Sequence, residues 1–240
     1  MQRLIALLVL AVPCLLLVHA ADPKPTPPEG VLPVGADGKA LNLDFETGTL
    51  KDWTAEGEAF KGQPVKGDMV AKRRGDMKSR HQGDYWIGGF ELHGDKPEGT
   101  LTSVSFTVTH PWATFLVGGG KSPETCVELA RADTKDVFSR TSGLDQEDMQ
   151  RVAVDLQAHL GKEIFIRLVD RNPNGWGHVN FDDFRFHSEK PDVPARKGEP
   201  PPPDIVKHAG LPPDKAAQVM TVPEGFTVSL FAGEPDVCQP

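Results

Sequence analysis

Two adjacent carboxylates interrupt a strand-like pattern late in the chain. Within residues 179–186, apolar side chains lie at 179 and 181 and then at 184 and 186, so the alternation shifts by one position at Asp182 and Asp183. A shift of this kind predicts a β-bulge, which turns side chains toward a neighbouring site. Because adjacent carboxylates repel each other, the pair indicates a specific chemical role.

Two more carboxylates lie near the start of the same domain. Asp44 and Glu46 share one face of a predicted strand at 41–46, whose other face is apolar. If this strand pairs with the strand that carries Asp182 and Asp183, up to four carboxylates converge. Carboxylate oxygens suit Ca²⁺, which binds them in flexible geometry. We therefore predict a structural calcium ion held mainly by Glu46 and Asp183, with Asp44 and Asp182 beside it; the alternative is that these residues cap turns and solvate an edge.

A glycosidase could use the same kind of carboxylate pair as its acid and base. Here the acidic residues cluster instead of facing each other across a bond, and no nearby apolar pocket is indicated that would raise one carboxyl pKa. The sequence also lacks a Cys-x-x-Cys-His haem attachment motif and a phosphate-binding loop. We predict no catalytic residues and no haem site within this chain.

The loop at 172–178 carries an aromatic ring and an imidazole toward the predicted bulge. Trp176 lies between Gly175 and Gly177, and His178 follows directly. An amphipathic indole ring supplies apolar area with a polar handle, which suits the face of a sugar. The same ring could instead close the end of a sandwich, and the sequence leaves both readings open.

The densest run of basic residues, at 72–81, lies in an otherwise acidic region. Arg73 and Arg80, with Asp68 nearby, could hydrogen-bond polyol or carboxylate groups. The ordinary alternative is a solvated loop. The candidate ligand-binding set is Arg73, Arg80, Asp68, Trp176 and His178.

These residues depend on many short strands to position them. Alternating apolar runs bounded by turn residues predict eight or nine strands, whereas helical patterns are confined to 156–160 and 214–220. The three glycines at 118–120 indicate a strand end that another backbone approaches closely. This pattern predicts an all-β fold, an antiparallel jelly-roll β-sandwich. The predicted strands are 41–46, 85–90, 104–108, 112–117, 126–130, 137–141, 152–156, 164–168 and 179–186.

Composition divides the chain and limits its partners. The chain carries 26 Lys and Arg against 34 Asp and Glu, a net charge of −8, which argues against nucleic acid as a partner. Cys126 is expected to be a small strand residue, and its pairing with Cys238 stays open. The predicted segments are a signal peptide at 1–20, a Pro-rich linker at 21–39, the β-sandwich at 40–188, a second Pro-rich linker at 189–213, and a propeller start or tail at 214–240. These segments predict export, to the periplasm or beyond the cell, with no transmembrane segment after signal cleavage.

Four short motifs in order resemble a known module. Asp44–Gly48 with Trp53, then Gly99–Ser103, Phe115–Gly120 and Gly175–Asp183, are similar to the β-sandwich module appended to levanase-type and other fructan-acting glycoside hydrolases. The resemblance covers about residues 42–187 and implies carbohydrate binding without hydrolysis.

A second resemblance lies at the C-terminal end. Val222–Pro240 is similar to the opening strand of the propeller in large secreted haem-binding dehydrogenases of the sorbosone/glucose type. This resemblance implies covalently linked C-terminal domains that the chain lacks, with any redox parts beyond it. We therefore expect a non-catalytic module that binds a polysaccharide or cell-surface glycan; the alternative is a structural accessory domain of such a dehydrogenase that binds no sugar.

Overall fold

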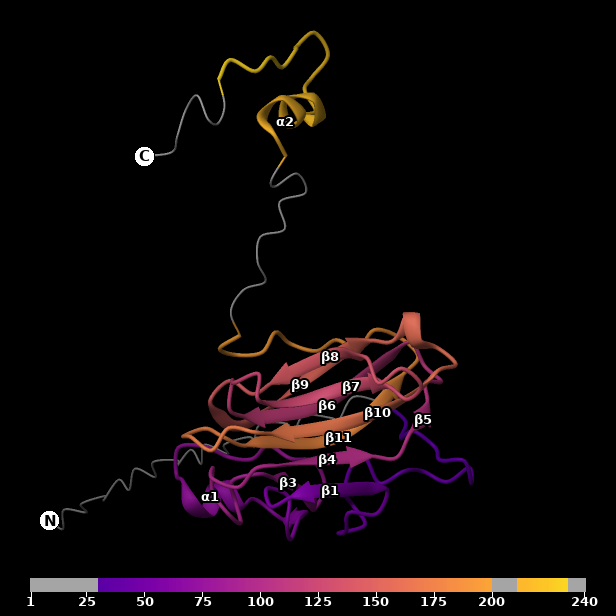
Figure 1. Ribbon diagram of the computed structural model, residues 1–240, viewed down its shortest axis with the longest axis vertical. Coiled ribbons are helices and arrows are strands. Elements are labelled where there is room, and N and C mark those ends of the chain that lie inside the picture. Colours follow the sequence, from indigo (N-terminus) through magenta and orange to yellow (C-terminus); the bar gives the residue numbers. More distant parts are fainter. Residues whose placement is uncertain (1–29, 200–210, 233–240) are drawn as a thin grey trace, which may run out of the picture. The chain divides into compact units, whose positions relative to one another are not determined.

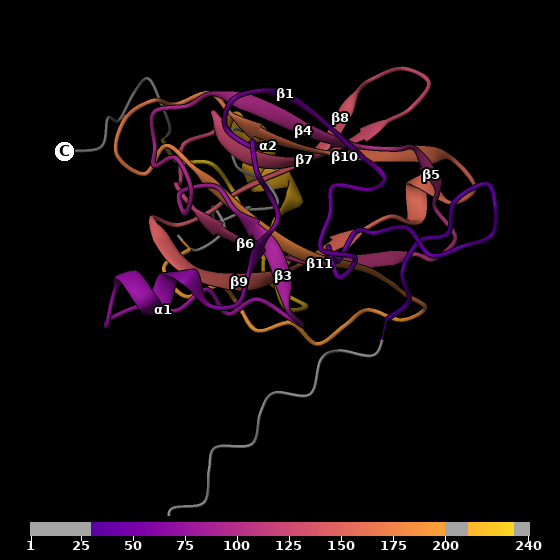
Figure 2. The same cartoon turned by 90° about the horizontal axis from the view of Figure 1, so that it is seen from below.

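Two antiparallel sheets make up the larger part of the protein (Figures 1 and 2). The computed structural model describes residues 30–199 and 211–232, and the chain divides into two units, Met1–Arg196 and Lys197–Pro240. The predicted signal peptide, residues 21–29 of the first linker, residues 200–210 of the second linker and Cys238 lie outside the described residues. No helix within the described parts of the chain is long and apolar enough to cross a membrane.

The sheets hold eleven strands and confirm the predicted all-β sandwich. The six-stranded sheet has the order β1-β4-β10-β7-β8, with β5 paired to β10, and the five-stranded sheet has the order β2-β3-β11-β6-β9. Seen from below, the two sheets form separate layers with α1 at the edge of the second (Figure 2). The strands are β1 Trp53–Gly57, β2 Val65–Lys66, β3 Tyr85–Gly88, β4 Gly99–Ser103, β5 Phe106–Thr107, β6 Trp112–Gly119, β7 Thr125–Arg131, β8 Val137–Ser142, β9 Gln146–Asp155, β10 Glu163–Asp170 and β11 Val179–His187.

Alternation in the sequence places apolar side chains between the sheets. In β10, Ile164, Ile166 and Leu168 are fully buried in the main core, as are Phe115 of β6 and Phe181 of β11. Each such side chain contributes roughly 1.5–3 kcal/mol on burial. Cys126 is buried in β7, as expected of a small strand residue.

The predicted strand at 41–46 is wrong. Leu43 and Phe45 are buried in the core, but the backbone turns through this segment, with a positive φ of 58° at Phe45. Local hydrogen bonds replace a ladder: the Asn42 side-chain amide donates to Thr49 O (2.8 Å), and Trp53 Nε1 donates to Asn42 O (2.8 Å). The segment therefore buries Leu43 and Phe45 without being a strand. It forms no ladder with the last strand, although Phe184 N of β11 donates one backbone hydrogen bond to Leu43 O (3.2 Å).

Both predicted helical segments are confirmed, but the sequence analysis missed one short helix. The turn at 156–160 contains the 3-10 helix η1, Gln157–His159, and the predicted helix at 214–220 corresponds to α2, Pro213–Val219. A short helix, α1 at Met69–Arg73, lies where the sequence indicated a loop. Val70 of α1 packs in a second apolar cluster with Trp86 and Met149, which fixes the helix on the five-stranded sheet.

Both predicted linkers are partly folded against the first unit. Val31 exchanges two backbone hydrogen bonds with Phe186 of β11 (2.9 and 2.8 Å), so residues 30–39 differ from the expected linker. Near the other end of the unit, Arg196 Nη1 donates to Ser142 O (2.8 Å). In the second unit, residues 220–232 form no strand, as expected of a strand segment separated from the rest of its sheet.

Candidate functional site

A pocket of about 240 Å³ gathers three of the predicted ligand-binding residues. Arg73 comes from the end of α1, whereas Trp176 and His178 come from the loop that leads from β10 into β11. The fold thus joins chain segments that are about a hundred residues apart. The pocket is lined by Arg73, Arg74, Phe90, Asp95, Glu147, Gly175, Trp176 and His178.

Close backbone packing sets the position of Trp176. A side chain at Gly177 would lie 1.7 Å from Asn172 O, and one at Gly120 would lie 1.9 Å from Trp176 O. The loop therefore presses against the end of β6, as the glycines at 118–120 predicted. Trp176 itself has a positive φ of 61°, a conformation that non-glycine residues adopt only when the surrounding structure imposes it.

The Trp176 ring is half-buried and stacks on the imidazole of His178. The two ring centroids are 5.6 Å apart with an interplanar angle of 28°. Phe90 approaches the same imidazole at 5.3 Å. Trp176 lines the pocket and keeps part of its surface exposed.

His178 is held between two carboxylates. Its exposed fraction is 2%, its Nδ1 lies 2.6 Å from Asp95 Oδ1, and its Nε2 lies 3.4 Å from Glu147 Oε2. The second contact is an ion-pair contact without well-directed hydrogen-bond geometry. Burial alone would lower the pKa of His178, but Glu147 and Asp95 together raise it. The site therefore favours the imidazolium form.

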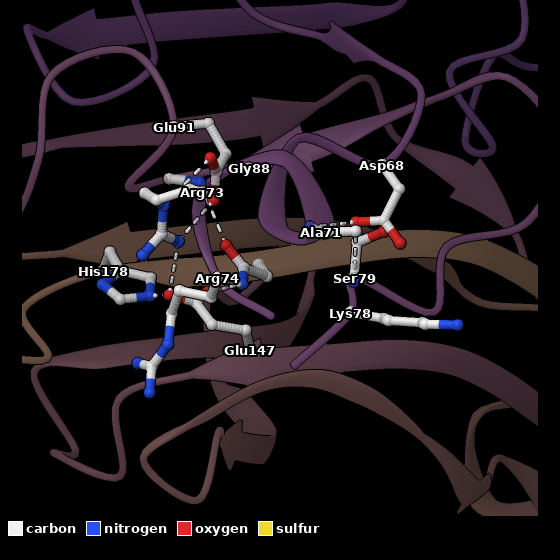
Figure 3. Close-up of polar contacts among 12 residues, drawn as sticks. Asp68, Ala71, Arg73, Arg74, Lys78, Ser79, Gly88, Glu91, Glu147 and His178 are labelled. Atoms are coloured by element: carbon white, nitrogen blue, oxygen red, sulfur yellow. Dashed lines mark hydrogen bonds and ion pairs between the residues drawn. The ribbon is translucent and has the colours of Figure 1, made fainter. Parts of the chain in front are cut away.

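Glu147 of β9 is the buried centre of the polar network (Figure 3). Its Oε1 accepts from Arg73 Nη2 (2.7 Å), and its Oε2 accepts from the Asn180 side chain (2.9 Å). Burial would raise the pKa of Glu147, but the nearby charge of His178 and the hydrogen bonds from Arg73 and Asn180 lower it to about 2. Glu147 is thus a permanent anion at neutral pH.

Arg73 connects this network to a second buried carboxylate. Its Nη2 also donates to Glu91 Oε1 (2.7 Å), and the Glu91 side chain is only 2% exposed. The guanidinium lies over the Phe90 ring, 4.3 Å from its centroid, which is a cation–π distance. Arg73 therefore holds Phe90 in place as well as neutralising Glu91 and Glu147.

The other two predicted ligand residues lie outside the pocket. Asp68 caps the N-terminus of α1, accepting from Ala71 N (2.9 Å) and Ser79 N (3.1 Å), as the separate group of contacts in Figure 3 shows. Arg80 has a positive φ of 58° and pairs with Asp148 at 3.2 Å. Both residues fix the segment 74–80 in the structure.

Asp170, at the end of β10, is a buried acid that the sequence analysis did not single out. Its Oδ1 has no hydrogen-bond partner among the described residues, and burial, with the charges of Asp95 and Glu98, raises its pKa to about 7. The pKa values of Asp170 and Glu147 lie far apart, as in acid–base catalysts. However, Asp170 does not line the pocket, and both Glu147 oxygens already accept hydrogen bonds, so the pair is not arranged to flank a bond.

The predicted carboxylate cluster is partly assembled at a second cavity of about 170 Å³. Its lining includes Asp44, Glu46 and Asp183, and the predicted bulge is confirmed by a register shift after Asp182 and a positive φ of 52° at Asp183. Arginines occupy both oxygens of Asp183: Arg151 Nη2 and Arg185 Nε each lie at 2.6 Å. The Glu46 carboxylate accepts backbone N–H groups at 84 and 85 (2.9–3.0 Å).

Asp182 does not line this cavity and is fully buried. Its Oδ2 accepts from Gln82 N (2.8 Å), its Oδ1 has no partner within the described chain, and burial raises its pKa well above the usual range. In the residues that the structure describes, no three or more His, Cys, Asp and Glu side chains are grouped so as to hold a metal ion. Arg151 and Arg185, which pair with Asp183, disfavour a cation at this cavity in the arrangement seen here. The calcium ion stays a prediction.

The main omissions of the sequence analysis are Glu147, Asp95 and Phe90. Glu147 carried a usable signal, because it lies two positions before the buried Met149 and so on the same side of β9. Asp95 and Phe90 lie in and near a turn after β3 and carried no such pattern.

Comparison with known proteins gives one sequence relative and several weak structural likenesses. No family model matches the chain. A protein of Aspergillus rugulosus that bears the name of a glycosyl hydrolase, ecdE, is 29% identical over 146 residues. The match covers 60% of this chain and 20% of that protein, so the chain spans about a fifth of the length of its relative.

Among solved structures, TmCBM61 in complex with β-1,4-galactotriose is 17% identical, with a TM-score of 0.38, over 60% of this chain and 93% of that one. The K1 cleaved adhesin domain of Lys-gingipain from Porphyromonas gingivalis W83 is 14% identical, with a TM-score of 0.38, over 61% and 96%. A family 35 carbohydrate-binding module from Clostridium thermocellum is 9% identical, with a TM-score of 0.28, over 55% and 87%. Likeness at this level does not extend to sites or ligands.

Proposed function

We propose that the pocket beside Trp176 binds a carbohydrate and that the domain is a non-catalytic binding module. The observation that carries this proposal is the partly exposed Trp176 in a pocket that is also lined by arginine and acidic residues. Sugars offer apolar C–H faces and hydroxyl edges, so an aromatic ring beside fixed polar groups matches both. The name of the relative ecdE supports a role alongside carbohydrate-active proteins.

The proposal includes a setting for the module. We propose that it is exported and tethered to further domains, with a polysaccharide or cell-surface glycan as its partner. The alternative, an accessory domain of a haem-binding dehydrogenase, would be favoured by an apolar patch on a sheet face. In the described part of the first unit, however, the large exposed apolar side chains all lie outside the strands: Val31, Val34, Leu92, Val104 and Leu160.

Affinity electrophoresis of the full chain in gels containing single polysaccharides tests the proposal. We expect one or more neutral glycans, fructans and galactans included, to retard the protein, and Trp176→Ala to abolish the retardation. Trp112→Ala is the matched control, because Trp112 is also half-buried but lies at the opposite end of β6. Retention that survives Trp176→Ala, or that Trp112→Ala removes equally, would contradict the proposed site.

Calcium at the second cavity is a separate proposal. Asp44, Glu46 and Asp183 supply carboxylates to one cavity wall, and calcium binding would require Arg185 to leave Asp183. A thermal melt with and without a chelator decides between the two states of this cavity. A melting midpoint that falls by several degrees with chelator supports a bound calcium ion. Melting curves that coincide with and without chelator contradict the calcium proposal.

A further inference from the structure

Resting on the proposed function, we propose that the Trp176 pocket accepts a single neutral sugar ring and discriminates against acidic glycans. The pocket contains two arginines, which at first suggest a site for uronate, sulfate or phosphate groups. The charges that surround these arginines point to the opposite preference.

Both guanidinium groups are already neutralised by carboxylates of the protein. Arg73 pairs with Glu91 and Glu147, each at 2.7 Å. Arg74 makes a two-point contact with Asp76, at 3.0 Å through Nε and 2.8 Å through Nη2. An incoming anion therefore meets no uncompensated cation in the arginine pair.

The charge balance of the pocket wall disfavours an anion even when His178 is protonated. The cations Arg73, Arg74 and His178 are opposed by Asp95 and Glu147 in the wall and by Glu91 and Asp76, which pair with the two arginines. Four carboxylates thus surround three cations. An acidic sugar would lose its hydration on entering a slightly negative site. No new ion pair would form to compensate for this cost in free energy.

The polar atoms that remain available match hydroxyl groups. The hydrogen bonds of the described residues use Nε and Nη2 of each arginine and Oδ1 of Asp95, which leaves Nη1 of Arg73, Nη1 of Arg74 and Oδ2 of Asp95. A sugar hydroxyl both donates and accepts, so it can bridge such a donor and acceptor pair. A carboxylate or sulfate can only accept and would face Asp95 directly.

The size of the pocket limits how much of a glycan can enter. Its volume of about 240 Å³ is below the roughly 300–1,000 Å³ that is typical of pockets for drug-sized ligands. One sugar ring stacked on Trp176 fits this space better than several consecutive units. We therefore expect the free monosaccharide to compete with the polysaccharide.

Affinity electrophoresis at physiological ionic strength, with neutral and acidic polysaccharides side by side, tests this preference. We expect the full chain to be retained by a neutral glycan, to be released by its monosaccharide, and to migrate freely in polygalacturonate and heparin. Asp76→Asn frees the charge of Arg74 at a side chain that is 63% exposed, and we expect it to raise retention by polygalacturonate several-fold. Asp133→Asn is the matched control, because it removes the same charge from an equally exposed Arg131 pair away from the pocket.

The outcomes separate the two levels of the proposal. Retention of the unaltered protein by polygalacturonate or heparin at least as strong as by any neutral glycan would overturn the neutral preference and leave sugar binding in place. Equal effects of Asp76→Asn and Asp133→Asn on acidic glycans would also overturn it. Free migration in every glycan would remove the proposed function itself.

Discussion

The protein contains two clusters of carboxylates and arginines that differ in what they leave exposed. At the bulge in β11, both oxygens of Asp183 are taken by Arg151 and Arg185, and no aromatic side chain is among the residues that line the cavity there. At the other cluster, Glu147 is equally buried and equally paired, but an indole and a phenyl ring lie beside it. In the first cluster, the charges of Asp183 and the two arginines pair with one another. In the second cluster, paired charges lie beside two aromatic rings that line a pocket.

This difference shows why acidic residues alone did not identify the site. The sequence drew attention to Asp182 and Asp183 because they interrupt an apolar alternation, and the structure confirms the bulge. A buried charge needs partners, and the partners come from distant strands. Whether a carboxylate is free to bind anything depends on those partners and not on the local pattern.

The largest effect should come from removing the charge at the centre of the pocket network. Glu147→Gln leaves Arg73 and His178 without their shared anion, and breaking a buried ion pair typically costs about 3–5 kcal/mol. We expect the free energy of unfolding in urea at pH 7 to fall by about 3 kcal/mol and glycan retention to weaken. Asp148→Asn, the next residue on β9, lies in an exposed pair with Arg80 and should cost under about 1 kcal/mol.

Asp183→Asn sharpens the same experiment. It removes an equally buried charge from the other cluster and should also lower the free energy of unfolding, but glycan retention should stay unchanged. If Asp183→Asn weakened retention as much as Glu147→Gln, the two clusters would not be separate in function.

A second effect should appear as a pH dependence, because the pKa values of Asp170 and His178 on the pocket side, and of Asp182 at the bulge, are all raised in the folded protein. Because the pKa of Asp170 is raised to about 7 in the folded protein, its contribution to stability is full below its unfolded pKa near 3.8 and is lost as pH rises through 7. The raised pKa of His178 acts in the same direction above its unfolded value of 6.5. We expect the free energy of unfolding to fall by about 2–4 kcal/mol between pH 5 and pH 8.

Asp170→Asn tests the origin of that slope, because an amide resembles the protonated acid and does not titrate. Urea unfolding of both proteins at pH 5 and pH 8 should give a smaller loss in the variant. Parallel losses in the two proteins would assign the slope to other groups.

Much of the fold could be predicted because its signals are local. The period-two runs of β6, β7, β10 and β11 located those strands, and the glycines at 118–120 indicated the close approach that Gly120 makes to Trp176 O. The segment at 41–46 misled because Leu43 and Phe45 are buried on alternate positions of a turn, and burial periodicity does not distinguish a turn from a strand.

The candidate site could be predicted only in part. Trp176, His178 and Arg73 were found through residue type and neighbouring glycines or charges. Their partners were not, because Asp95 lies 83 residues from His178 and Glu147 lies 74 residues from Arg73. Arg80 was grouped with Arg73 by proximity in sequence, yet the chain turns between them, and sequence proximity does not fix the direction of a side chain.

The central claim is that a neutral glycan binds at Trp176. The most direct test follows the indole N–H signals in a ¹H–¹⁵N spectrum of the full chain while a neutral glycan that retards the protein in affinity electrophoresis is added. The chain has four tryptophans, and the indoles of Trp53 and Trp86 donate to backbone oxygens at 2.8 and 2.9 Å. The account predicts that the signal absent from Trp176→Ala shifts saturably, while those of Trp53 and Trp86 stay fixed. A Trp176 signal that does not move at saturating glycan, or a saturable shift confined to Trp112, would contradict it.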